Sequence, residues 1–305
     1  MEFSRYNQSG LIVPPREEEE AYPYRRVWPS IILETGLVFS VTLIVFITYN
    51  FIGVRFPDSI ARLVNIGIAV FPAIIWTIIS LWRETRAVEP RTGLAISFVI
   101  SVLAAYFARY TVIVPLAPES YLSLVGSIER ILGYAFTVGA VQEGTKYLIL
   151  RYVTRVNDQR IRSDSLAYAV PIAIGHVVTM MLTMPNLSII SSDVLAAQMF
   201  HTYSLHLIGG LIVAYGIAAL RFDGRSLLVL PISVLLATVF NGFVSSVRTE
   251  FLNAGFTLGL TAPRLLIGFL FTLGIVIGGL SIILFVTNAA ERREQEMRIT
   301  NELQL

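Results

Sequence analysis

The stretch VLAAQMFHTYSLHLIGGLIVAYGIAAL, residues 194–220, decides the fold class because it contains no Asp, Glu, Lys or Arg. About 20 mostly apolar helical residues suffice to cross the hydrocarbon layer of a membrane. Seven other segments meet the same requirement. The sequence therefore predicts an all-α, polytopic membrane bundle of about eight transmembrane helices. The predicted spans are 31–53, 63–82, 94–116, 131–150, 165–183, 194–220, 227–247 and 265–288.

The overall composition also favours a membrane environment over water. Of the 305 residues, 55% are hydrophobic and 14% are charged, too few charges to cover the surface of a soluble domain. The chain has no cysteine, which excludes disulfides, cysteine metal sites and thiol nucleophiles. A net charge of +2 gives no indication of nucleic-acid binding. The expected partners are membrane lipids.

Basic residues outside the spans predict the orientation, since Lys and Arg in short loops stay on the cytoplasmic side. Both tails and the second, fourth and sixth loops together hold 16 arginines, whereas the other loops hold five. We therefore expect a multi-pass plasma-membrane protein with both ends in the cytosol. Residues 1–29 form a polar cytoplasmic tail without the apolar core of a cleaved signal sequence. Residues 30–288 form the transmembrane domain, and 289–305 a cytoplasmic helix or tail.

One pair of opposite charges lies inside a predicted span. Lys146 is the only lysine in the chain, and Glu143 lies three residues before it, close enough for the two to pair on one helix. The pair is interpreted either as a structural ion pair or as a functional carboxylate that ligates a metal or acts as a general base. The other polar residues in the spans are Arg109, Gln142, His176, His201, His206 and Asn241.

His176 and His206 are predicted to lie near the middle of the membrane, where two imidazoles can share a metal ion. The alternative is that each donates a hydrogen bond to a neighbouring helix. His201 lies five residues before His206, roughly 140° around the helix, so at most one of the two belongs to a common site.

Asp164 begins the fifth span, where a helix cap explains it without any chemistry. Tyr168, one turn later, suits an interfacial aromatic. In the last span Gly274 and Gly278 form a small-xxx-small pair, which favours close helix packing within the chain over a dimer interface.

The region from about 139 to 246 resembles the PrsW family of intramembrane peptidases. That family carries a Glu-Glu-x-x-Lys box, then a span that opens with Asp and continues to Tyr-Gly and a Glu, then a span with His, and finally a second His followed by Gly. Here the boxes read GAVQEGTKYLIL, DSLAYAVPIAIGHVVTMM, LHLIGGLIVAYGIA and VFNGFVSS. The matching residues are Glu143, Lys146, Asp164, Tyr168, Gly175 and His206.

Four positions depart from the family pattern: Gln142, Ala169, Met180 and Asn241. The resemblance implies catalytic roles for Glu143 and Lys146, metal ligation by Glu143 and His206, and substrate binding by Asp164, Tyr168 and Asn241. A catalytic zinc needs three nitrogen or carboxylate ligands, and neither thioether nor amide is a good substitute. His176, one turn before Met180, is the available third ligand.

Helix geometry places Glu143 and His206 at different depths. Glu143 lies about 12 Å from Arg151 along the helix axis, and His206 about 22 Å from Arg221. Tilt, or a break near Gly139 and Gly144, would be needed to bring the two side chains together.

The sequence favours a non-catalytic relative that holds no cofactor and binds a membrane protein partner or transmembrane segment. The alternative is an active zinc peptidase that uses Glu143, His206 and His176. A third reading, a transporter lined by Arg109, Glu143 and Lys146, ranks last because no inverted repeat is evident.

Overall fold

The computed structural model describes residues 27–82, 91–116, 122, 125–156, 162–222, 226–252 and 264–303. Within these residues every regular element is a helix, as predicted. The π-helical segments η3, η4 and η5 each continue the α-helix before them. The elements are α2 (Val27–Ile47), η3 (Thr48–Ile52), α3 (Asp58–Trp82), α4 (Arg91–Ala108), η4 (Arg109–Ile113), α5 (Val114–Leu116), α7 (Ser127–Tyr134), η5 (Ala135–Gly139), α8 (Ala140–Val156), α9 (Arg162–Leu182), α10 (Ser192–Phe222), α11 (Val229–Phe251) and α12 (Leu265–Leu303).

Seven helices of the described part are long and apolar enough to cross a membrane, and they correspond to seven of the predicted spans. The predicted span 131–150 falls within the continuous helix formed by α7, η5 and α8. This helix is long enough to cross, but it is not among the seven because its polar and charged residues make it less apolar. The helical membrane bundle is confirmed, with seven apolar spans.

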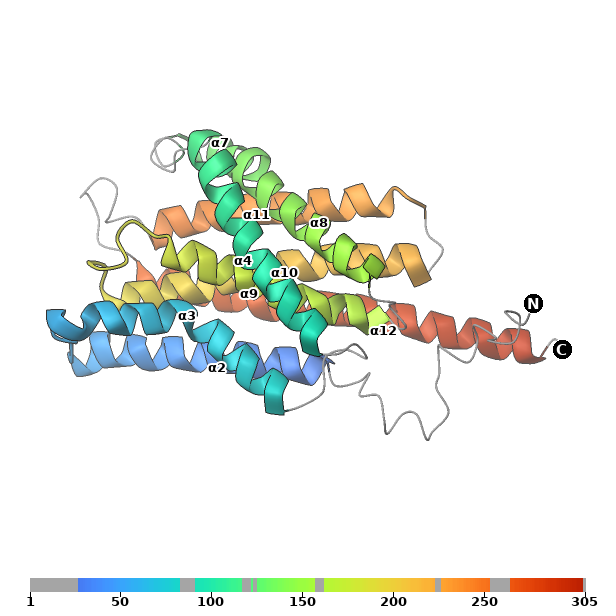
Figure 1. The fold of residues 1–305 in the computed structure, drawn as a ribbon, viewed down its shortest axis with the longest axis horizontal. Helices are drawn as coiled ribbons and strands as arrows, with labels where there is room; N and C mark the ends of the chain where they lie inside the picture. The colour runs from blue at the N-terminus through green and yellow to red at the C-terminus, as the bar shows by residue number, and fades with distance from the viewer. Residues whose placement is uncertain are drawn as a thin grey trace.

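Helices α9 and α10 form the centre of the bundle. In their most apolar windows 94% and 72% of the residues are buried, against 22–44% in the other five spans. Around this pair α10 contacts α2, α3, α8, α11 and α12, while α4 packs on α9 (Figure 1). The outer helices therefore bury one face against the central pair and leave the other face to the surroundings.

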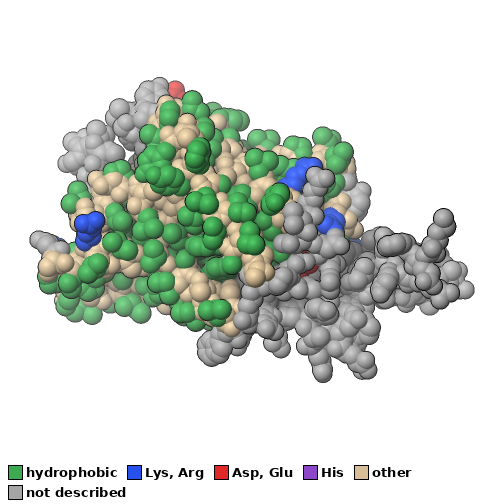
Figure 2. Space-filling view, viewed as in Figure 1, with side chains coloured by type: hydrophobic (Ala, Val, Ile, Leu, Met, Phe, Trp, Pro, Cys, Tyr) green, Lys and Arg blue, Asp and Glu red, His purple; other side chains and the backbone are tan. Residues whose placement is uncertain are grey.

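The outward faces of these helices are apolar. Large side chains such as Phe107, Leu148 and Phe285 are more than 60% exposed. Figure 2 shows a broad hydrophobic surface on the visible face, with arginine side chains toward the two ends of its described part; the only lysine, Lys146, is buried. A surface of this extent is unfavourable in water and favourable in lipid.

The C-terminal helix α12 continues to Leu303, past Ala290 where its apolar span ends. It projects beyond the other helices at the right of Figure 1. The helical part of the predicted segment 289–305 is thus present. The predicted tail 1–29 lies outside the described residues except for 27–29.

Glycines set the closest approach between α7 and α11. A Cβ added at Gly242 would lie 2.5 Å from the Ile131 carbonyl oxygen and 2.6 Å from the Ala135 backbone nitrogen. By contrast, no described atom lies within 4 Å of a Cβ added at Gly274 or Gly278. The expectation that these two glycines pack closely within the chain is therefore wrong, because the helix face they occupy has no neighbour in the described part.

We predict opposite effects of alanine at these glycines. Gly242→Ala forces backbone atoms of α7 and α11 apart and lowers the free energy of unfolding by about 1–3 kcal/mol. Gly274→Ala, the matched control, leaves it unchanged or raises it by up to about 1 kcal/mol through helix propensity. Thermal unfolding in detergent measures both changes. Equal stability of the two variants would contradict the close contact between α7 and α11.

Candidate functional site

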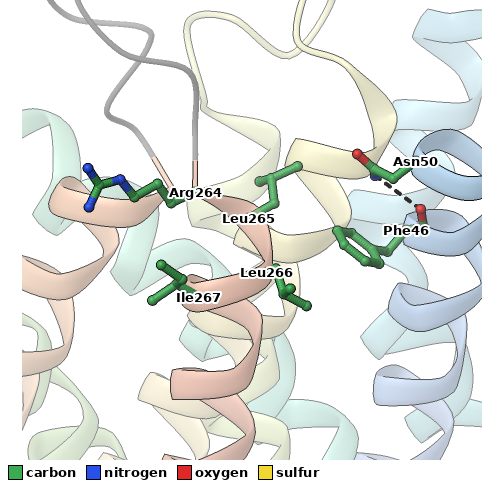
Figure 3. Close-up of a pocket in the computed structure, with 6 residues that line it drawn as sticks. All are labelled: Phe46, Asn50, Arg264, Leu265, Leu266 and Ile267. Carbon is green, nitrogen blue, oxygen red and sulfur yellow. Dashed lines mark hydrogen bonds between the residues drawn. The ribbon is translucent and has the colours of Figure 1, made fainter.

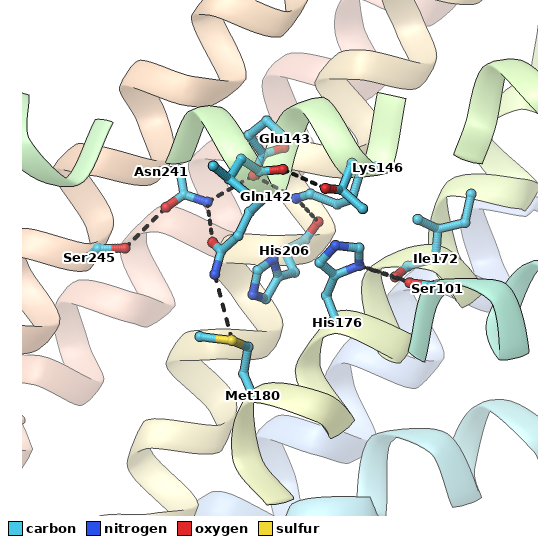
Figure 4. A network of polar contacts seen from close by, with 12 residues as sticks. Ser101, Gln142, Glu143, Lys146, Ile172, His176, Met180, His206, Asn241 and Ser245 are labelled. Carbon is cyan, nitrogen blue, oxygen red and sulfur yellow. Dashed lines mark hydrogen bonds and ion pairs between the residues drawn. The ribbon is translucent and has the colours of Figure 1, made fainter. Parts of the chain in front are cut away.

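A polar network occupies the interior of the bundle where four helices meet (Figure 4). Helix α8 contributes Gln142, Glu143 and Lys146; α9 contributes His176 and Met180; α10 contributes His206; and α11 contributes Asn241 and Ser245. All of these side chains are buried, and those of Glu143, His206 and Asn241 are completely inaccessible.

The Glu143–Lys146 ion pair predicted from their spacing is present. Lys146 Nζ lies 2.6 Å from Glu143 Oε1, and the two side chains are 1% and 0% exposed. Lys146 also donates to the backbone carbonyl oxygen of His206 at 3.3 Å. A second donor, Asn241 Nδ2, lies 2.9 Å from the same Glu143 oxygen. The carboxylate charge is therefore compensated by one ammonium and one amide.

Amide and thioether groups extend the network on one side. Asn241 Nδ2 also donates to Gln142 Oε1 at 2.9 Å, and Ser245 donates to Asn241 Oδ1 at 3.2 Å. Gln142 Nε2 lies 3.7 Å from Met180 Sδ, and the Arg109 guanidinium lies 3.3 Å from the same sulfur. Arg109, which the sequence left isolated in its span, is thus brought next to Met180.

The two midplane histidines lie side by side, with ring centroids 5.4 Å apart and planes inclined by 43°. His176 Nδ1 is 2.8 Å from Ser101 Oγ on α4 and 3.1 Å from the Ile172 carbonyl oxygen. His176 Nε2 and both ring nitrogens of His206 have no hydrogen-bond partner among the described residues. The predicted bond to a neighbouring helix is therefore made by His176 and not by His206.

His201 belongs to a different contact. Its Nδ1 lies 2.7 Å from Thr272 Oγ1 on α12, and its Nε2 lies 3.0 Å from the Val244 carbonyl oxygen on α11. The prediction that at most one of His201 and His206 shares the common site is confirmed, because their directions differ around the helix.

The predicted depth difference between Glu143 and His206 is closed in the fold. Gly209, one turn after His206 on α10, lies so close to Glu143 that an added Cβ would be 2.9 Å from either carboxylate oxygen. On the other side, Gly139 ends the π-helical segment η5 and faces α11, where an added Cβ would be 2.9 Å from the Thr238 carbonyl oxygen. The helix runs without a break through Gly139, and glycines at 139 and 209 let it lie close to both α10 and α11.

Metal ligation by Glu143, His176 and His206 is the least supported of the predicted roles. Within the described part of the chain no group of three or more His, Cys, Asp and Glu side chains is arranged to hold a metal ion. The Glu143 oxygen Oε1 already accepts hydrogen bonds from Lys146 and Asn241, while Oε2 has no partner among the described residues.

Asp164 and Tyr168, predicted with Asn241 to bind a substrate, lie apart from it along α9. They precede His176 by twelve and eight residues, or about 18 Å and 12 Å along the helix axis. Both side chains are fully buried. Asp164 lies in the first turn of α9, where the positive end of the helix dipole stabilises the charge of a carboxylate. Of the three residues, only Asn241 joins the network.

Sequence reasoning missed Ser101, Ser245 and Gly209. Each is a small residue in an apolar span, and small residues are common in membrane helices. Their spacing along the sequence could not predict a shared site, because they lie on three different helices.

A separate surface pocket of about 350 Å³ lies at one end of the bundle (Figure 3). It is lined by Phe46, Asn50, Arg264, Leu265, Leu266 and Ile267. None of these residues belongs to the buried network.

Comparison with known proteins leaves the family question open: no family model, no curated protein and no solved structure matches the chain. The resemblance to PrsW peptidases therefore stays a prediction from the sequence motifs.

We predict that removing one charge of the buried ion pair lowers the free energy of unfolding more than removing both. Glu143→Gln leaves the Lys146 ammonium buried without its carboxylate and lowers the free energy of unfolding by about 3–5 kcal/mol. Adding Lys146→Met removes the orphaned charge and restores most of the stability. Thermal unfolding in detergent measures the two variants, with Glu129→Gln, a change at an exposed residue, as the control. A double variant as unstable as Glu143→Gln would show that the loss of stability does not come from the unpaired ammonium.

Proposed function

We propose that this chain is a multi-pass protein of the plasma membrane, a non-catalytic relative of PrsW-type peptidases that binds a membrane protein partner or a transmembrane segment. The observation that carries the proposal is the hydrogen bond from Asn241 Nδ2 to Glu143 Oε1, at 2.9 Å, at the position where the family pattern has its second histidine. An amide NH₂ group is a hydrogen-bond donor without a lone pair for a metal, so Asn241 compensates the carboxylate and does not add a ligand beside it.

The donors around Glu143 support the proposal. Asn241 directs its NH₂ group, a hydrogen-bond donor, toward Glu143 and Gln142, and its oxygen accepts from Ser245. At Met180 the thioether sulfur lies against the Arg109 guanidinium and the Gln142 amide. A zinc ion needs lone pairs directed at it. Asn241 directs N–H groups at the carboxylate, and Met180 supplies a soft sulfur that lies beside a cation. Neither residue therefore offers zinc a good ligand.

An active zinc peptidase is the second candidate, and one observation favours it. His206 and His176 together present three ring nitrogens without a described hydrogen-bond partner, beside a carboxylate with one free oxygen. Buried polar atoms usually have a partner, so a ligand at this point would satisfy them. In this reading Glu143, His206 and His176 hold zinc, which activates a water molecule for hydrolysis.

Metal analysis separates the two candidates. We expect the purified wild-type protein, incubated with zinc and then desalted, to retain no stoichiometric metal. A variant with Gln142→Glu, Met180→Glu and Asn241→His rebuilds the donor set of the PrsW-like boxes and should bind about one zinc per chain. Elemental analysis by mass spectrometry gives the stoichiometry.

The opposite result has a clear form. If the wild type retains one zinc per chain that His206→Ala abolishes and His201→Ala does not, the non-catalytic proposal is wrong. His201 is the matched control because its two ring nitrogens bond to Thr272 and Val244.

We also propose that the helix formed by α7, η5 and α8 is an eighth span, so that both ends of the chain lie in the cytosol. The alternation of arginine-rich loops supports this topology. Partner helices support it too, because α8 packs against α4, α9, α10 and α11, and its Glu143 and Lys146 side chains are buried among them.

Cysteine labelling tests the count, since the chain has no cysteine of its own. With a membrane-impermeant maleimide on intact cells, we expect Ser191→Cys, in the exposed loop between α9 and α10, to react. Ser4→Cys and Gln304→Cys should react only after permeabilisation. Labelling of Ser4→Cys and Gln304→Cys from opposite sides would require an odd number of spans.

A further inference from the structure

The pocket in Figure 3 lies where two spans reach the membrane boundary. Phe46 and Asn50 belong to the last turns of the first span, Val27–Ile52, and Arg264 directly precedes the last span, Leu265–Ala290. The pocket therefore lies at the level where the hydrocarbon layer gives way to lipid head groups.

The pocket is lined by one cationic side chain and several apolar ones. In Figure 3 the side chains of Leu265, Leu266 and Phe46 lie between Arg264 on one side and Asn50 on the other. Arg264 is exposed, and its guanidinium has no ion-pair partner among the described residues. A guanidinium offers several N–H donors in a geometry that fits phosphate oxygens.

An acidic side chain that contacts the pocket residue Asn50 is buried. Asn50 Nδ2 donates to the Asp193 carboxylate at 3.1 Å and to the Phe46 carbonyl oxygen at 3.0 Å. Asp193 is 8% exposed and lies in the first turn of α10, where the helix dipole stabilises its charge. The buried Asp193 carboxylate therefore does not line the pocket. Among the residues that do line it, Arg264 is the only charged one.

We infer that this pocket is a binding site for an anionic membrane phospholipid. Its phosphate group is held by Arg264, and the start of one acyl chain lies over Phe46 and Leu266. The charge of Arg264 attracts the phosphate, and the apolar side chains favour an anion with a hydrocarbon part over a soluble one. The exposed residues Phe51 and Ile52 continue the apolar surface beside the pocket. This site is independent of the buried network and of whether that network binds metal.

Native mass spectrometry of the full chain tests the site with phosphatidylglycerol as the probe. We expect one phosphatidylglycerol molecule to survive detergent washing that removes phosphatidylcholine. Arg264→Gln should weaken this binding about tenfold, the effect of losing one charge-assisted hydrogen bond. Leu266→Trp fills the pocket, keeps Arg264 and should also weaken it. Leu266 is 54% exposed, so the larger side chain does not disturb the packing of the bundle.

The control is Arg55→Gln, which removes another exposed arginine that does not line the pocket. It should retain phosphatidylglycerol as the wild type does. Equal retention by the wild type and Arg264→Gln would overturn the phosphate contact, and equal retention by Leu266→Trp would overturn the pocket. Thermal unfolding of each variant shows that the fold is intact.

Discussion

Burying a carboxylate and an ammonium together in an apolar bundle is the constraint on which the interior of this protein depends. Either charge alone in the membrane would be very costly, but a pair with further hydrogen bonds is tolerated. Glu143 and Lys146 meet this condition through contacts from two other helices, Asn241 on α11 and the His206 carbonyl on α10. The close packing of α8 against those helices follows from the need to surround the pair, and glycine at 139 and 209 makes the approach possible.

The same compensation limits the chemistry of the site. A metal centre needs oxygen and nitrogen lone pairs pointing at one position, whereas here an ammonium and an amide NH₂ point at the Glu143 oxygen. Met180 faces a guanidinium in the same way. Three of the residues that differ from the PrsW motifs, Gln142, Met180 and Asn241, fit into one hydrogen-bonded network. His176 Nε2 and both ring nitrogens of His206 are the part of the network without a hydrogen-bond partner among the described residues.

Outside the interior, lipid takes the place of a protein partner. The outer helices expose apolar faces along their length, and a Cβ added at Gly274 would meet no described atom within 4 Å. Exposed arginines such as Arg55 and Arg264 lie next to the ends of the helices. The molecule thus separates two environments, with charges satisfied by protein at the centre and by water or head groups at the rim.

The sequence by itself determined the all-helical membrane class, seven of the spans and the Glu143–Lys146 pair, since each depends on local composition or on spacing within one helix. It also placed His201 and His206 in different directions. Only the tertiary structure decided that Gly274 and Gly278 lack a neighbour among the described residues, and that Ser101, Arg109 and Gly209 meet the network. These relations join residues on separate helices. They depend on tilt, on π-helical turns and on side-chain size at each crossing, and periodicity along one helix contains none of that information.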